Sequence, residues 1–236
     1  MSDIQIDVKL KNSLSRPSVG KPSISTPNSA GQERVQKTLG DPPPALADIR
    51  EFPDHVRQSF AYDGLLRMIE RKLNALTGEK YAIVPAQGDR VCIDEQGRVF
   101  VGRLFMEENF QNHPLVAGVL AHEWGHFPTR RQKRNLDALS WDEVYKIRRQ
   151  EETLADMFCG RALFMLGYPI EPLINYLKKH ENPNDKSPKY HTAESRGRVI
   201  VTTYGSQKKR SSMASNLQFS DDVYGDPIHT TRLIGS

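Results

Sequence analysis

Apolar residues recur at helical spacing in four parts of the chain. These segments span about residues 55–76, 114–127, 141–166 and 171–180. The second segment is apolar almost all round from Leu115 to Ala121 and carries Pro114 near its first turn. Such a pattern is typical of a buried helix, because proline is tolerated in the first turn and no polar face is left for solvent.

Short extended runs rich in β-branched residues lie between the first and second helical segments. They span residues 81–84, 90–93 and 99–101. Gln96 and Gly97 provide a turn signal between the last two runs. The order of elements therefore predicts an α+β fold with a small antiparallel sheet followed by helices.

The two ends of the chain differ from its centre in composition. Residues 1–47 are rich in Ser, Pro, Lys and Asn, and they contain few large apolar side chains. Such a segment cannot offset the entropy lost on ordering, so we expect it to be flexible. It is a linker, a delivery signal or an inhibitory pro-segment. Residues 48–205 form the expected folded domain, and residues 206–236 a polar C-terminal tail.

Composition narrows the classes of function. The chain has 236 residues, of which 37% are hydrophobic, which is enough for one core. Its formal charge of +4 is small, and its basic residues are scattered, so no nucleic-acid binding is expected. No segment has the roughly 18 to 20 apolar residues needed to span a bilayer, and no signal-peptide core follows the N-terminus. We therefore expect a soluble protein that is not membrane-embedded.

The two cysteines indicate whether the protein resides in a reducing or an oxidising compartment of the cell. Cys92 and Cys159 both fall in apolar surroundings and are expected to be small buried residues. A reduced cytoplasmic setting is the simpler interpretation, with secretion without a cleavable signal peptide as the alternative. A disulfide between them stays open at this point, since it depends on a distance.

The chemistry of the chain centres on the pattern His-Glu-x-x-His formed by His122, Glu123 and His126. Two histidines four residues apart share one face of a helix, so their imidazole nitrogens can converge on one Zn²⁺ ion while the glutamate reaches a water. The alternative is a helix with two structural histidines. Buried histidines beside a glutamate need partners, however, and a metal supplies them.

A third metal ligand is needed, and the helix at 141–166 offers candidates. Glu152 and Asp156 lie four residues apart and therefore on one face of that helix. One carboxylate can bind the metal while the other orients a ligand histidine. We therefore expect one zinc ion per chain between this helix and the helix at 114–127.

These paired motifs, His-Glu-x-x-His and Glu-x-x-Ala-Asp, resemble those of the gluzincin metallopeptidases. The chain is most similar to the HtpX-type peptidases, which include the CAAX prenyl endopeptidases. Residues 65–73 resemble the leading helix of that family, and residues 98–105 resemble the strand before its active-site helix. The resemblance covers about residues 60–200 and implies a zincin-like fold and peptidase activity.

The resemblance also implies a role for each residue of the motifs. His122, His126 and Glu152 would bind zinc, Glu123 would act as the general base, and Asp156 would accept a hydrogen bond from His122. Glu151 is the rival third ligand. It would point about 100° away around the helix, and its spacing to Asp156 does not fit the family pattern.

A further family segment, His-Pro followed by an arginine, is matched only in part. Here His191 is followed by Thr192, and Arg196 comes slightly earlier than in the family. His191 either approaches the metal, where it would donate to the developing oxyanion or block the zinc, or it is a surface histidine. Arg196, Tyr190 and Tyr204 are further candidates for oxyanion stabilisation.

The chain departs from the family again after the second histidine. Pro128 cannot donate a helical hydrogen bond, so we expect the active-site helix to end or kink close to His126. The basic run at 130–134 would then lie in a loop beside the site. It is either solvated or in contact with an acidic substrate or partner.

Together these features predict a zinc-dependent endopeptidase that hydrolyses protein or peptide substrates. The strand at 98–104 is expected to be an edge strand that receives an extended peptide by main-chain pairing. One alternative is a delivered protease whose N-terminal segment is an export signal. Another is a non-catalytic binding module that zinc stabilises.

Overall fold

A computed structural model describes residues 43–126, 139–181 and 191–221, with side chains as far as Met213. The expectations that concern Pro128, the basic run at 130–134, Tyr190 and most of the two ends of the chain lie outside the described residues.

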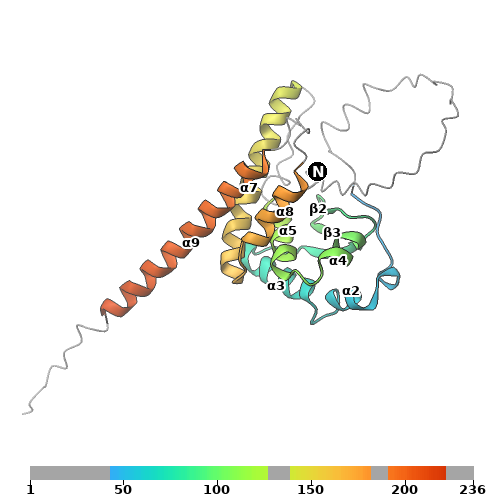
Figure 1. Ribbon diagram of the computed structural model, residues 1–236, viewed down its shortest axis with the longest axis horizontal. Coiled ribbons are helices and arrows are strands. Elements are labelled where there is room, and N and C mark those ends of the chain that lie inside the picture. The colour runs from blue at the N-terminus through green and yellow to red at the C-terminus, as the bar shows by residue number, and fades with distance from the viewer. Residues whose placement is uncertain (1–42, 127–138, 182–190, 222–236) are drawn as a thin grey trace, which may run out of the picture.

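The described elements confirm the α+β class (Figure 1). In chain order they are η1 (Ile49–Glu51), α2 (Asp54–Ser59), α3 (Leu65–Thr77), β1 (Ala82–Ala86), β2 (Val91–Ile93), β3 (Arg98–Gly102), α4 (Arg103–Asn109), α5 (His113–Gly125), α7 (Trp141–Leu166), α8 (Glu171–His180) and α9 (Ala193–Asp221). No described helix has both the length and the apolar character that crossing a bilayer requires.

The three-stranded sheet is mixed, which corrects the expectation of an antiparallel sheet. Its strand order is β1-β3-β2, with β1 parallel to β3 and β2 antiparallel to it. The turn between β2 and β3 has the expected Gly97, and the carboxylate of Asp94 accepts hydrogen bonds from the backbone of Gln96 and Arg98. The expectation of an edge strand at 98–104 is wrong, because β3 lies between two strands. The short β2 occupies an edge of the sheet instead.

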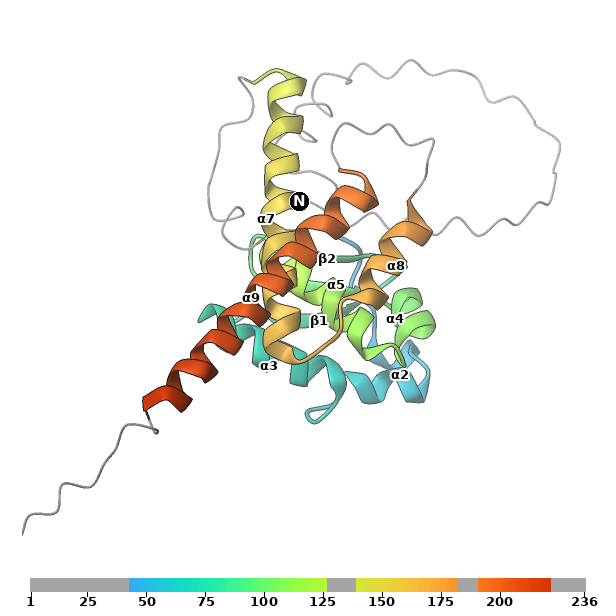
Figure 2. The ribbon, with the colours of Figure 1, turned by 60° about the vertical axis from the view of Figure 1, so that its left-hand side comes forward.

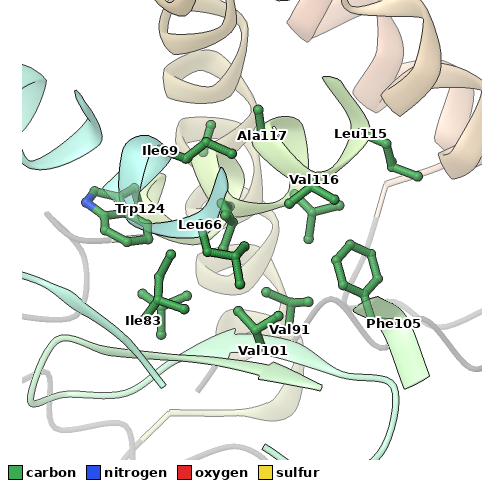
Figure 3. Close-up of a cluster of buried hydrophobic side chains, with 14 of the residues drawn as sticks. Leu66, Ile69, Ile83, Val91, Val101, Phe105, Leu115, Val116, Ala117 and Trp124 are labelled. Carbon is green, nitrogen blue, oxygen red and sulfur yellow. The ribbon is translucent and has the colours of Figure 1, made fainter. Parts of the chain in front are cut away.

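Helices α3 and α5 cover one face of the sheet and form the main core with it (Figure 3). The side chains of Ile83, Val91 and Val101 point from the three strands toward Leu66 of α3 and Val116 of α5. Full burial of each such side chain contributes roughly 1.5–3 kcal/mol. The core therefore fixes α5 against the sheet.

Helix α5 is buried along almost its entire length, as its all-round apolar sequence predicts. The side chain of Asn112 caps it by accepting a hydrogen bond from the backbone of Leu115, and every residue from Leu115 to Gly125 is buried. The helix ends at Gly125 with His126 as its C-terminal cap residue. It therefore stops close to the second histidine of the motif, as expected.

Helix α7 packs against both α5 and α9. A capping box between Ser140 and Glu143 begins α7, and it ends at Leu166 before Gly167. Figure 2 shows α9 crossing α7 and then extending away from the other elements. The boundary expected at 205 and 206 lies inside α9.

Three further differences concern the bounds of the helices. The helix expected at 55–76 is divided into α2 and α3, α4 follows β3 directly, and α9 occupies a segment without helical periodicity. The helices expected at 141–166 and 171–180 are confirmed.

Two glycines allow the helices around α7 to approach closely. A Cβ atom on Gly125 of α5 would lie 2.7 Å from the Cα atom of Ala155 in α7. A Cβ atom on Gly160 of α7 would lie 2.5 Å from the carbonyl oxygen of Ile200 in α9. Both distances are far below van der Waals contact, so a larger residue would push the helices apart.

We predict that Gly125→Ala lowers the free energy of unfolding by about 1–3 kcal/mol, because the new methyl group overlaps the backbone of α7. Gly205→Ala is the matched control, since nothing lies within 4 Å of a Cβ atom there and alanine favours a helix. Urea denaturation of the two variants and the parent measures both changes. Equal stability of the two variants would contradict this account of the packing.

Candidate metal centre

Ionisable side chains from three helices meet where α7 crosses α5 and α9. His122, Glu123 and His126 come from the C-terminal end of α5, Glu152 and Asp156 from the middle of α7, and Arg196 from the start of α9. The first five residues are at most 1% exposed, and Arg196 is 8% exposed. Charged groups are rarely buried to this extent without partners.

The two histidines and Glu152 bring two ring nitrogens and two carboxylate oxygens close together. The Nε2 atoms of His122 and His126 are 3.1 Å apart. The two carboxylate oxygens of Glu152 lie 3.3 Å from Nε2 of His122 and 3.6 Å from Nε2 of His126. Ligand atoms of a tetrahedral zinc site, each about 2.0–2.2 Å from the metal, are separated by about 3.3–3.6 Å. The separations of 3.1, 3.3 and 3.6 Å are therefore close to those of a zinc ligand set.

Among the described residues, the buried carboxylate of Glu152 has only two imidazoles and, at 4.0 Å, one guanidinium as its charged neighbours. Both of its carboxylate oxygens are buried, and neither forms a hydrogen bond within the described part of the chain. A buried carboxylate without hydrogen bonds is unfavourable by several kcal/mol unless a nearby positive charge offsets the cost. A cation bound between Glu152 and the two imidazoles would remove that cost, so the residues present fit a metal.

The neighbouring Glu151 does not share this position. It lies on another side of α7 and forms an ion pair with Arg148, with 2.9 Å between Nη1 and Oε2. This arrangement matches the angular argument from the sequence. Glu152 is the carboxylate that faces the histidines.

Glu123 lies next to the same point and is held by the sheet. A carboxylate oxygen of Glu123 and ring nitrogens of His122 and His126 all lie within 4.8 Å of one another. Its Oε2 atom accepts a hydrogen bond of 3.1 Å from the backbone N–H of Ile93 in β2. The edge strand therefore orients this carboxylate. A backbone donor leaves no signal in the sequence, so this contact could not be predicted.

Asp156 determines which nitrogen of His122 faces the centre. Its Oδ1 atom lies 2.9 Å from Nδ1 of His122, and a carboxylate can only accept, so Nδ1 carries the proton. The Nε2 atom of the neutral ring then offers its lone pair toward His126 and Glu152. This is the relation that metal-binding histidines commonly have with a carboxylate.

Arg196 completes the pairing of Asp156. Its Nε atom donates to Oδ2 at 3.0 Å and its Nη2 atom to Oδ1 at 2.9 Å, which is a two-bond contact. Burial raises the pKa of Asp156, but the charge of Arg196 and the hydrogen bond with His122 outweigh it and lower the pKa to about 2. Asp156 is thus a carboxylate at any physiological pH.

His122 itself binds a proton tightly in the metal-free protein. Burial and the charge of Arg196 both lower the pKa of His122, but its contacts with Asp156 and Glu152 outweigh them and raise this pKa to about 9. The doubly protonated ring would place a positive charge where the sequence predicts a metal. A proton and a metal would therefore compete for the same nitrogen.

The remaining candidates for oxyanion stabilisation within the described residues are His191 and Tyr204. His191 is partly exposed just before α9, and no described contact joins it to the histidines or to Glu152. The ring of Tyr204 packs against Phe164 in an edge-to-face contact with centroids 5.5 Å apart. Cys92 and Cys159 are both buried, and no disulfide joins them. Of the oxyanion candidates that the structure describes, only Arg196 contacts the cluster.

Comparison of the chain with protein-family models, with curated proteins and with solved structures finds no match. The assignment of a function therefore depends on the residues of the site.

The pKa of His122 predicts how the stability of the metal-free protein depends on pH. The folded-state pKa of about 9 is above the ordinary 6.5, so the contribution of His122 is fully present below about pH 6.5 and is lost as the pH rises through about 9. The loss is up to about 3 kcal/mol. Urea denaturation in the presence of a chelator measures it.

His122→Gln should remove this loss, while replacement of the exposed His113 by Gln should leave it in place. Parallel stability curves for the parent and His122→Gln would show that His122 does not titrate in this way.

Proposed function

We propose that this protein is a zinc-dependent endopeptidase that hydrolyses peptide bonds of protein or peptide substrates. The observation that carries the proposal is the buried Glu152 carboxylate, which faces the Nε2 atoms of His122 and His126 at the spacing of a zinc ligand set. The similarity of the two motifs to those of gluzincin peptidases supports the same function. One zinc ion per chain would be held by these three residues.

When bound at this position, zinc supplies Lewis acidity that polarises a substrate carbonyl and lowers the pKa of a water. The residues of the chain provide the other requirements of hydrolysis. Asp156 keeps His122 in the tautomer whose Nε2 atom faces the centre.

Glu123 is the proposed general base. Its carboxylate lies within 4.8 Å of the ring nitrogens of His122 and His126, near the point at which a water would attack. The N–H of Ile93 donates to Oε2, which restrains the position of the carboxylate. In this role Glu123 takes a proton from the attacking water and later delivers it to the leaving amine.

A second candidate is a non-catalytic binding module that a metal stabilises. Complete burial favours it, because His122, Glu123, His126 and Glu152 are at most 1% exposed. A structural metal site is closed, whereas a catalytic one must admit a substrate. The delivered-protease alternative concerns the N-terminal segment and lies outside the described residues.

Metal analysis tests the ligand set. We predict about one zinc per chain in the purified protein and far less than one in Glu152→Gln, because structural ligand sets of this kind bind zinc tightly. Glu151→Gln is the matched control, since the neighbouring carboxylate faces Arg148. Equal zinc content in both variants would show that Glu152 is not a ligand.

Replacement of Glu123 separates the two candidate functions. We predict that Glu123→Gln retains zinc and loses peptide hydrolysis by at least about a hundredfold, as expected when a general base is removed. Mass spectrometry of digested unfolded substrates, and of self-cleavage fragments, measures the loss. Undiminished hydrolysis would exclude Glu123 as the base, and absence of hydrolysis in the parent protein would favour the binding module.

A further inference from the structure

We propose that Arg196 is a positioning residue of the metal site, which acts on the ligand His122 through Asp156. This inference rests on the zinc site of the proposed function but not on its peptidase activity. It replaces the sequence-based expectation that Arg196 stabilises an oxyanion.

The contacts of Arg196 are those of a buried structural support. Two of its nitrogens donate to the two oxygens of Asp156 at 3.0 and 2.9 Å. A planar guanidinium that binds both oxygens fixes the plane of a carboxylate, which a single donor cannot do. The orientation of Asp156 is therefore set from α9.

The orientation of Asp156 in turn sets that of His122. Oδ1 of Asp156 lies 2.9 Å from Nη2 of Arg196 and 2.9 Å from Nδ1 of His122, so one oxygen serves both donors. If the carboxylate rotated, this oxygen would leave the plane of the imidazole. The Nε2 atom of His122 would then no longer be directed at the shared point with His126 and Glu152.

The position of Arg196 depends on the packing of α9 against α7. Gly160 admits the backbone of α9 at Ile200, one helical turn after Arg196. The arginine is thereby carried to Asp156 as part of a rigid helix. A third helix contributes to the metal site although it supplies none of the three ligands.

Arg196 also lies close enough to oppose a metal directly. Its Nη2 atom is 3.4 Å from Nε2 of His122 and 4.0 Å from Oε2 of Glu152. Repulsion of the cation would make Arg196 weaken zinc binding, whereas positioning makes it strengthen zinc binding. The charge of Arg196 is paired with that of Asp156, so its repulsive field falls off steeply. We therefore expect positioning to dominate.

The test is a double-mutant cycle on the full chain, with zinc affinity measured by competition with a chelator. We expect Arg196→Gln to weaken zinc binding about tenfold, at the lower end of the range for residues that support metal ligands. In an Asp156→Asn background the same replacement should change the affinity less than about twofold, because the amide has one accepting oxygen and the two-bond contact with Arg196 is already lost.

Two further variants refine the cycle. Arg198→Gln is the matched control, because Arg198 is exposed two residues along the same helix, and it should leave the affinity unchanged. Arg196→Lys retains the charge but loses the planar two-bond contact, so it should remain several-fold weaker than the parent. The absorption spectrum of the cobalt-substituted protein should change in both Arg196 variants but not in Arg198→Gln, since it reports ligand geometry.

Tighter zinc binding in Arg196→Gln, or the same change in both backgrounds, would overturn the proposal in favour of direct repulsion. Unchanged affinity would overturn it while leaving the metal site intact, whereas a parent protein without zinc would overturn both. If Arg196→Gln does not fold, two other measurements decide the question. One compares the zinc affinity of Asp156→Asn with that of the double variant, in which both charges are removed. The other is the zinc affinity of Arg196→Lys.

Discussion

The burial of three carboxylates and two imidazoles at one helix junction is the constraint on which the rest of the structure depends. Burial of an unpaired charge is unfavourable by several kcal/mol, so each group requires a partner. The carboxylate of Asp156 is paired with Arg196 and His122, and that of Glu123 accepts a hydrogen bond from the N–H of Ile93. Glu152 has no hydrogen bond in the described part of the chain. Its charged neighbours are the imidazoles of His122 and His126, and a cation bound between them is the partner proposed for it.

The packing of the helices follows from the same requirement. The buried ionisable side chains of α5 and α7 can meet only if the two helices approach closely, and Gly125 permits this one residue before His126. Gly160 permits the corresponding approach of α9, which brings Arg196 to Asp156. The sheet contributes through its edge strand β2, which packs against α5 and donates a hydrogen bond to the carboxylate of Glu123. Each layer of the fold thus supports a different part of the cluster.

The sequence predicted the parts of the site that depend on helical periodicity. His122 and His126, and likewise Glu152 and Asp156, are four residues apart, so each pair shares a helix face in any α-helix. The parallel pairing of β1 with β3 could not be predicted, because a strand pattern does not specify neighbours. Helix α9 is rich in Ser, Thr and Lys without a continuous apolar stripe, so it gave no helical signal. The close approach of α5 and α7 did have a sequence signal in Gly125, since a glycine inside a helix often marks close packing.

The most direct test of the account is X-ray absorption at the zinc edge on the purified full-length protein. The account predicts a four-coordinate site with two imidazole nitrogens and carboxylate oxygen at about 2.0–2.2 Å, and loss of that spectrum in Glu152→Gln. Scattering from sulfur at about 2.3 Å would contradict it, because Cys92 and Cys159 are not part of the cluster. A spectrum with oxygen ligands alone would contradict it equally.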